Sequence, residues 1–395
     1  MKPNITFEIH QDLLDLRAKF LSRGFDIRFV GGCVRDMLLL VESNDIDLCT
    51  DATPDEQLQL YTEFDIHNIP TGAQHGTYTV VMSGISYEIT SLRTESDHDG
   101  RYATMSFTKD WIEDLSRRDL TINAMALTFD GELIDPFGGK NDLENHIVRF
   151  VGDGAERIKE DYLRIMRYFR FLGRFGTLET ALDSDDLKNI CDNVGGLLDI
   201  SAERIWSEFK KIMLHPSGEW VIQLMLAKKI FKCTPLAGFT TNTIAHYRKQ
   251  KLAFQEHNPI TLFTSFVGPF DVFTPGNINR FAKELKWSTE ERKVVEYIAS
   301  HGNRCIVSNL LHDIAVNGRD RALAIEVIKY WGDDTHLDDV RNFAFEPFPV
   351  SGNDLLARGM KPGKEMGATL LMMKNHWFKL GCTCDKDTLL ALIEL

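Results

Sequence analysis

The sequence predicts an α+β protein in which a mixed β-sheet domain is followed by a long helical part. Up to about residue 150, short β-forming segments alternate with helical ones, whereas later apolar residues recur mainly at helical spacing. No internal repeat or low-complexity linker interrupts the helical part. With 395 residues, 43% of them apolar, the chain is long enough for roughly two to four domains.

The N-terminal domain is expected to contain a strand, a glycine turn and a helix in direct succession. FDIRFV (25–30) alternates between apolar and polar residues, the glycine pair at 31 and 32 ends the strand, and CVRDMLLL (33–40) has a helical pattern. Three further strands are expected at DIDLCT (45–50), GTYTVVM (76–82) and SYEITSL (86–92). These segments predict the mixed sheet.

Helices are expected after residue 153. ERIKEDYLRIMRYFRFLGRF (156–175) and SAERIWSEFKKIML (201–214) both have helical periodicity, and we expect each to form one helix. The remainder of the chain has few β signals and is also expected to be helical.

The composition limits the possible partners. A net charge of −13 argues against a protein that coats nucleic acid non-specifically, because phosphate contacts need clustered lysine and arginine. One basic cluster exists, since the segment 157–174 has six basic residues against two acidic ones. No apolar run approaches the ~18 residues of a membrane span, and the first residues carry acids where a targeting segment would be basic. We therefore expect a cytoplasmic protein without membrane contacts.

Two carboxylates one residue apart, Asp45 and Asp47, are candidate metal ligands. Residues i and i+2 of a strand project from the same face, and two like charges there are costly unless a cation lies between them. Mg²⁺ suits this position because it takes one or two carboxylates together with substrate phosphates. Glu88 is the candidate third carboxylate, because an acid in the middle of a strand is otherwise unfavourable. Taken alone, such a pair is more often a solvated, acidic strand end, and it is the neighbouring glycine turn and arginine that favour the metal site.

The glycine turn favours a phosphate site. Gly31 and Gly32 lack a Cβ, so their backbone N–H groups can approach a triphosphate closely, and the N-terminus of the following helix favours anions. Arg35 adds a charged fork for phosphate oxygens. The alternative is a tight turn followed by an arginine on the helix surface.

The order of these motifs resembles one enzyme family. GGCVRD (31–36) and DIDLCTDATP (45–54) resemble the first signature of class II nucleotidyltransferases, which comprise the tRNA CCA-adding enzymes and related bacterial poly(A) polymerases. The family's later motifs are matched in order by RRDLTINAMAL (117–127), DPFGGKNDL (135–143), EDYLRIMRYFRF (160–171), SAERIWSEF (201–209) and the tail-like FPVSGNDLLARGMKPGKEMGATL (348–370). The resemblance reaches both ends of the chain.

The resemblance implies a polymerase-β-like catalytic head at 1–150, followed by an elongated all-α neck at 151–216, body at 217–345 and tail at 346–395. The implied activity is template-independent, Mg²⁺-dependent addition of C, C and A from CTP and ATP to the 3′ end of tRNA, with release of pyrophosphate. The body and tail would bind tRNA, and no DNA partner is expected. Asp45 and Asp47 would hold Mg²⁺ and act in catalysis with Glu88. The implied nucleotide site comprises Gly31, Gly32, Arg35, Arg118, Asp119, Asn123, Asp161, Arg164, Arg167 and Arg170.

Asp161 and Arg164 are expected to select the base. Cytosine and adenine present an amine beside a ring-nitrogen acceptor, which matches a carboxylate and a guanidinium, whereas uracil and guanine would turn a carbonyl toward the carboxylate. We expect both residues on one helix, where i, i+3 spacing directs them to one base edge. The alternative is a solvated amphipathic helix with internal ion pairs. We also expect Asp119 to support Arg118 or cap a helix, and Asn123 to orient a backbone segment.

The segment RTESDHDGRYATMSFTKDW (93–111) resembles the family's flexible loop, with Asp99, Gly100 and Arg101 at its glycine-hinged centre. Family members that add only CC lack this loop, so its presence favours addition of CCA or of A alone. Poly(A) polymerase relatives have a basic C-terminus, whereas this chain ends in DKDTLLALIEL. A non-catalytic tRNA-binding protein is the alternative from another class, and the sequence leaves the oligomeric state open.

Overall fold

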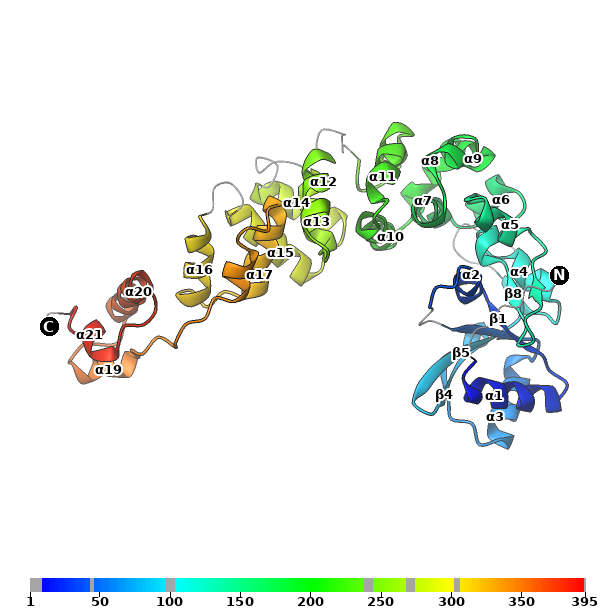
Figure 1. Ribbon diagram of the computed structural model, residues 1–395, viewed down its shortest axis with the longest axis horizontal. Coiled ribbons are helices and arrows are strands. Elements are labelled where there is room, and N and C mark those ends of the chain that lie inside the picture. The colour runs from blue at the N-terminus through cyan, green and yellow to red at the C-terminus, as the bar shows by residue number, and fades with distance from the viewer. Residues whose placement is uncertain are drawn as a thin grey trace. The chain divides into compact units, whose positions relative to one another are not determined.

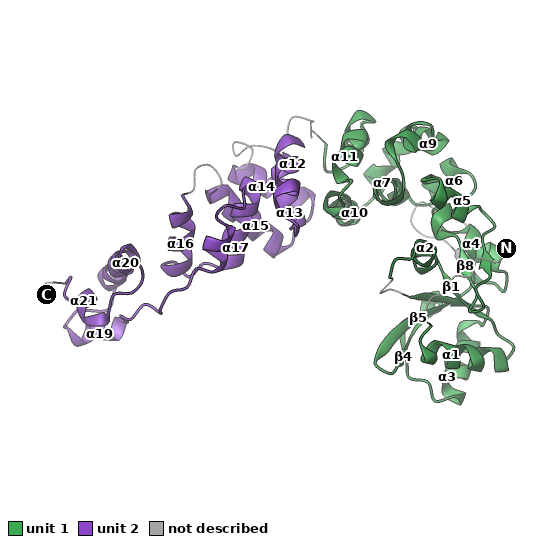
Figure 2. Ribbon diagram, viewed as in Figure 1, with its two compact units in different colours: residues 1–237 green, residues 238–395 purple. Residues whose placement is uncertain are grey.

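The computed structural model describes residues 9–42, 46–96, 104–237, 244–267, 274–301 and 306–393. The chain forms two compact units, residues 1–237 and 238–395 (Figure 2). Unit 1 contains the β-sheet together with many helices, and the described part of unit 2 contains helices only (Figure 1). The predicted α+β class, with a sheet near the N-terminus and helices after it, is confirmed.

The sheet of unit 1 has seven strands in the order β3-β4-β5-β2-β1-β8-β9. Strands β2 and β5 run parallel, and the other neighbours run antiparallel. A separate hairpin consists of β6 and β7. The bounds are β1 Ile27–Val30, β2 Asp47–Thr50, β3 Asn68–Gly72, β4 Thr77–Met82, β5 Ile85–Ser91, β6 Arg93–Ser96, β7 Thr104–Phe107, β8 Ala126–Leu127 and β9 Leu133–Ile134. The four predicted strands are confirmed as β1, β2, β4 and β5.

Helices α1 (Gln11–Ser22) and α3 (Pro54–Glu63) pack on one face of the sheet. Alternate strand residues, such as Phe29 and Leu48, form a buried core with Phe20 of α1. Each large apolar side chain buried in this way contributes roughly 1.5–3 kcal/mol. The sheet is therefore a rigid base for the residues at its strand ends.

The remaining helices of unit 1 follow the sheet strands or are inserted between them. They are α2 Gly32–Leu38, α4 Trp111–Ser116, α5 Gly139–Glu144, α6 Gly154–Glu160, α7 Leu163–Phe175, α8 Leu178–Leu182, α9 Asp185–Asn193, α10 Ala202–Leu214 and α11 Gly218–Ala227, with short 3₁₀ turns η1 Ala73–His75, η2 Thr121–Asn123, η3 Val194–Asp199 and η4 Ile230–Cys233. Helix α7 packs against α10 and α11. Its apolar side is buried, including Ile165, Phe169 and Leu172, and its arginines lie on the opposite stripe.

The prediction of a single helix through residues 156–175 is wrong. Helix α6 ends at Glu160, Asp161 has extended backbone angles (φ −153°, ψ 105°), and α7 begins at Leu163. The carboxylate of Asp161 accepts a hydrogen bond from the backbone N–H of Leu163 at 3.0 Å, which closes a local turn in place of continued helix. Asp161 and Arg164 thus do not share one helix.

Unit 2 is built from ten described helices. They are α12 Ile244–Ala253, α13 Pro259–Val267, α14 Pro275–Glu284, α15 Thr289–His301, α16 Val307–Ala315, α17 Arg321–Trp331, α18 Leu337–Arg341, α19 Gly352–Ala357, α20 Lys364–Lys379 and α21 Lys386–Leu390. Helices α12, α13, α15 and α17 pack together. The last three helices share a second core around Trp377. Among the described residues, no helix has the length and apolar character to cross a bilayer.

Candidate active site

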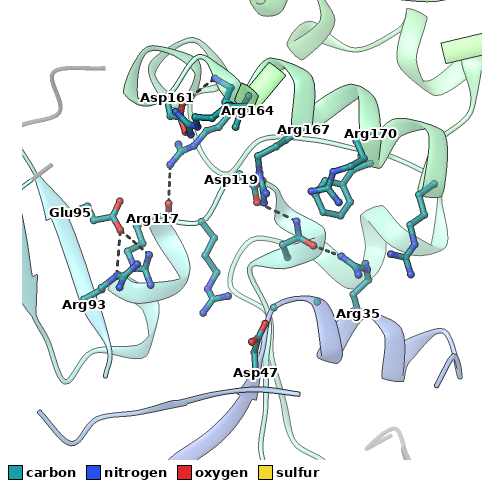
Figure 3. Close-up of a pocket in the computed structure, with 18 residues that line it drawn as sticks. Arg35, Asp47, Arg93, Glu95, Arg117, Asp119, Asp161, Arg164, Arg167 and Arg170 are labelled. Atoms are coloured by element: carbon teal, nitrogen blue, oxygen red, sulfur yellow. Dashed lines mark hydrogen bonds and ion pairs between the residues drawn. The ribbon is translucent and has the colours of Figure 1, made fainter. Parts of the chain in front are cut away.

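A pocket of about 710 Å³ lies in unit 1, where strand ends of the sheet face α7 (Figure 3). It is lined by Gly31, Gly32, Arg35, Asp47, Arg93, Glu95, Arg117, Arg118, Asp119, Asn123, Asp161, Leu163, Arg164, Arg167, Arg170, Phe171, Arg174 and Arg204. All ten residues expected to bind the nucleotide are among them. Nine lining arginines face four lining carboxylates, so the pocket is positively charged and suits a polyanion such as a triphosphate.

The turn after β1 needs glycine for two reasons. Gly31 has φ 71° and ψ −128°, a region that side chains other than glycine rarely adopt. A Cβ on Gly31 would also lie 2.7 Å from Nη1 of Arg118. Arg118 donates from Nη2 to Oδ2 of Asp114 at 3.2 Å and to Sγ of Cys49 at 3.6 Å. Burial opposes the charge of Arg118, but Cys49 and Asp114 outweigh it and raise its pKa.

Asp47 begins β2 and lines the pocket. In the parallel pairing of β2 with β5, Asp47 is the partner of Glu88, so the two side chains lie on the same face of the sheet. Glu88 is exposed and does not line the pocket. Asp45 lies outside the described residues, among which no three His, Cys, Asp or Glu side chains form a metal-binding group. Neighbouring carboxylates are nevertheless the ligand type that Mg²⁺ prefers, so Asp47 and Glu88 fit such an ion.

A chain of hydrogen bonds joins α2 to α7 across the pocket (Figure 3). Arg35 donates from Nη1 to Oδ1 of Asn123, Asn123 donates from Nδ2 to Oδ1 of Asp119 at 3.2 Å, and Arg167 donates from Nε to Oδ2 of Asp119 at 2.6 Å. Arg35 is buried and also pairs with Asp36 at 2.9 Å. Burial lowers the pKa of Arg35. The side chains of three separate elements therefore hold one another in place.

The hydrogen bonds between α2 and α7 correct two expectations. Asp119 supports Arg167 rather than Arg118, because the Arg118 guanidinium pairs with Asp114 instead. Asp119 caps no helix, since η2 has no side-chain cap, and Asn123 orients the side chains of its neighbours, not a backbone segment. Burial favours the neutral form of Asp119, but Arg167 and Asn123 outweigh it and lower its pKa, which keeps the carboxylate charged.

Asp161 and Arg164 both line the pocket although they are not on one helix. Asp161 accepts from Nη2 of Arg204, on α10, at 2.7 Å. Arg164 donates from Nη1 to Glu160 and from Nη2 to the backbone oxygen of Arg117 at 3.3 Å. The two side chains are brought together by the turn between α6 and α7 and by partners on other elements.

The arginine stripe of α7 continues along the pocket. Arg170 donates from Nε to Oε2 of Glu208 at 2.6 Å, and its guanidinium lies 4.1 Å from the ring centroid of Phe171. Arg174 lies 3.5 Å from Asp36. The SAERIWSEF segment was predicted as a family motif, and Arg204 and Glu208 within it were not predicted as the residues that make these contacts.

The β6–β7 hairpin forms another wall. Glu95 pairs with Arg117 at 2.9 Å and with Arg93 at 3.5 Å (Figure 3). These three residues were not predicted as site residues. The expected loop residues Asp99, Gly100 and Arg101 lie outside the described residues.

Comparison with known protein families matches two segments of the chain. Residues 27–149 match the Poly A polymerase head domain, and residues 181–234 match the model described as the probable RNA and SrmB-binding site of polymerase A. Both segments lie in unit 1 and include most of the pocket's elements.

Two curated proteins are similar over nearly the whole chain. CCA tRNA nucleotidyltransferase 1, mitochondrial, of Homo sapiens is 35% identical over 97% of this chain and 90% of its own length. A CCA-adding enzyme of Pediococcus pentosaceus is 33% identical over 92% of this chain and 93% of its own length. Among solved structures, the Bacillus stearothermophilus CCA-adding enzyme in complex with CTP has a TM-score of 0.77 at 24% identity, covering 98% of this chain and 96% of that one, which shows a common fold.

Proposed function

Because this chain belongs to the family of CCA-adding enzymes, we propose that it adds C, C and A to the 3′ end of tRNA, with CTP and ATP as substrates. The RNA 3′-hydroxyl attacks the α-phosphate of the nucleotide, and pyrophosphate leaves. The observation that carries this proposal is the pocket itself, in which nine arginines and one strand-end carboxylate, Asp47, surround a space suited to a nucleoside triphosphate.

The arginines divide into two proposed groups. Arg35 and Arg118, beside the glycine turn, would bind the triphosphate with the backbone N–H groups of that turn. Arg167 and Arg170 lie further along α7 and would contact the remaining phosphate and sugar oxygens of the nucleotide or of the RNA end. Each guanidinium has more N–H donors than the contacts described above use, so donors remain for a ligand.

Asp161 and Arg164 are proposed to read the base. Each oxygen of the Asp161 carboxylate already accepts one hydrogen bond, from Leu163 or from Arg204, and each oxygen has a second lone pair. One of these can accept from the amine of cytosine or adenine, and Arg164 can donate to the ring nitrogen beside it. Uracil and guanine would leave buried acceptors unpaired, at a cost of ~1–3 kcal/mol each.

We propose that Asp47 holds Mg²⁺. From the family pattern, Asp45 would be a second ligand, and Glu88 would be the third carboxylate. Bound there, the ion would supply a lowered pKa for the attacking hydroxyl and charge neutralisation for the leaving pyrophosphate. Within the chain, Asp47 is fixed by its place at the start of a central strand, and the arginines around it orient the phosphate groups.

We further propose that residues 1–150 act as the catalytic head, 151–216 as the nucleotide-selecting neck, and 217–345 and 346–395 as tRNA-binding body and tail. We also propose a cytoplasmic location, whereas similar proteins of Homo sapiens and Mus musculus are named as mitochondrial.

The decisive experiment supplies the purified protein with a tRNA transcript that lacks its last three nucleotides, Mg²⁺ and all four nucleoside triphosphates. We expect products that are three nucleotides longer, end in CCA and grow no further. A second transcript that already ends in CC is supplied in parallel. Addition of a single A to this second transcript alone would indicate an A-adding enzyme, and open-ended A tails would indicate a poly(A) polymerase. No incorporation into either transcript would leave a tRNA-binding protein.

A further inference from the structure

Asp114 of α4 has the environment of a functional carboxylate, although it does not line the pocket. Its side chain has no exposed surface. It accepts from Arg117 Nε and Nη2 at 3.0 and 2.9 Å, from Arg118 Nη2 at 3.2 Å and from the backbone N–H of Arg93 at 3.2 Å. Burial favours its neutral form, but Arg118 and Arg117 outweigh this and lower its pKa. One buried anion thus holds two adjacent arginines and the first residue of β6.

The groups held by Asp114 all belong to the pocket wall. Arg118 passes beside Gly31, and the carboxylate of Asp47 is close enough to raise its pKa. Arg117 pairs with Glu95, and its backbone oxygen accepts from Arg164. Through Arg117, Asp114 is therefore connected to the hairpin wall and to the proposed base-reading arginine, and through Arg118 it acts electrostatically on the strand-end carboxylate.

We propose that Asp114 is a positioning residue that holds Arg118 away from Asp47 and fixes Arg117 at the hairpin side of the pocket. This inference rests on the proposed nucleotidyl transfer at the same site. Without the charge of Asp114, the guanidinium of Arg118 is still attracted by Asp47, which also lines the pocket, and pairing there would occupy a carboxylate oxygen needed for metal binding.

Simple stabilisation of the fold is the competing explanation, and Asp142 of α5 provides a matched control. Asp142 is also fully buried in unit 1, pairs with Arg149 at 2.6 Å and accepts from Oγ1 of Thr121 at 2.6 Å, but none of these three residues lines the pocket. Asp142→Asn therefore reports the cost of losing a buried carboxylate–arginine pair, and Asp114→Asn reports that cost plus any effect on the site.

The test compares these two variants with the unaltered protein in urea unfolding, in CTP affinity without metal by calorimetry, and in steady-state C addition at varied CTP and Mg²⁺. We expect both variants to lose stability. Only Asp114→Asn should bind CTP about tenfold more weakly, because one charged hydrogen bond is lost, and only this variant should need more Mg²⁺ for its half-maximal rate. Equal CTP affinity and Mg²⁺ requirement in the two variants would overturn the inference.

If Asp114→Asn does not fold, Asp114→Glu tests the positioning role, because it keeps the negative charge and moves the carboxylate by one methylene. We expect it to fold and to show a raised KM for CTP; an unchanged KM would again overturn the inference. The proposed function fails separately, if the unaltered protein incorporates no CTP at all.

Discussion

Replacing Gly31 with alanine tests whether the turn after β1 serves the pocket or only reverses the chain. The backbone of Gly31 (φ 71°, ψ −128°) is a conformation that costs a residue with a Cβ about 1–3 kcal/mol. The new Cβ would also lie 2.7 Å from Nη1 of Arg118, too close for any real contact. That atom is the end of a flexible side chain, so the guanidinium moves. Its hydrogen bond to the buried Asp114 is then lost, at about 1.5–3 kcal/mol for a charged pair.

Gly24→Ala is the matched control. Gly24 also has a positive φ, 79°, but a Cβ there would meet no atom within 4 Å. It lies in the turn between α1 and β1, away from the pocket lining. Both variants should therefore lose stability through backbone strain, and only Gly31→Ala should also displace Arg118.

The assay combines thermal unfolding with C addition to a tRNA transcript at subsaturating CTP. For each ~2 kcal/mol of strain, a unit of this size should lose about 4–8 °C in Tm. We expect Gly24→Ala to retain its activity per folded molecule and Gly31→Ala to lose at least about tenfold in kcat/KM, the equivalent of ~1.4 kcal/mol. If the two variants are equally active per folded molecule, the placement of Arg118 does not matter and the reasoning is refuted.

Four further variants test other residues of the chain. Asp47→Asn should abolish nucleotide incorporation while leaving the unfolding midpoint nearly unchanged, and retained incorporation would exclude the proposed metal position. Asp161→Ala should raise incorporation of U or G relative to C in competition assays more than it weakens triphosphate binding; unchanged base choice would refute the base-reading role. Asp119→Asn should lower the unfolding free energy by about 1–3 kcal/mol in urea, because Arg167 loses its paired charge, and a change within error would contradict this. Burial lowers the pKa of His257 from 6.5 to about 4, so between these pH values the unfolded chain binds a proton that the folded chain does not, and the free energy of unfolding should fall as the pH drops from about 6.5 to 4. His257→Gln should make this fall smaller in unfolding experiments across the same pH range. Parallel pH curves for the variant and the unaltered protein would contradict the prediction.

Sequence periodicity was sufficient for the central sheet strands and not for the β6–β7 hairpin. Strands β1, β2, β4 and β5 carry alternating apolar residues that form the core, and that alternation is visible in the sequence. The hairpin strands have four residues each and are fixed by distant contacts, such as the bond from Nη1 of Arg93 to the backbone oxygen of His75. Contacts of this kind leave no periodic signal.

The break between α6 and α7 shows a second limit of the sequence. Helical spacing of apolar residues continues through the segment, so a single helix was the natural prediction. The break depends on the Asp161 carboxylate, which bonds the backbone N–H of Leu163 and pairs with Arg204, 43 residues further along the chain. The residue types for base reading could be predicted, but their relative placement could not, because it depends on a tertiary partner.

The pairing of the arginines could not be predicted for a related reason, and it explains how so many positive charges can share one pocket. Several pocket arginines pair with carboxylates that do not themselves line the pocket. The pairs are Asp36 with Arg35 and Arg174, Asp114 with Arg117 and Arg118, Glu160 with Arg164, and Glu208 with Arg170. Each carboxylate offsets repulsion between neighbouring guanidinium groups and fixes their direction, while leaving other donors toward the ligand. Charges oriented before the ligand arrives need little reorganisation on binding, which is the condition under which electrostatic stabilisation of a phosphoryl group is strongest. It follows that loss of one of these carboxylates should weaken triphosphate binding, even though it makes the pocket more positive. Net charge alone would predict tighter binding.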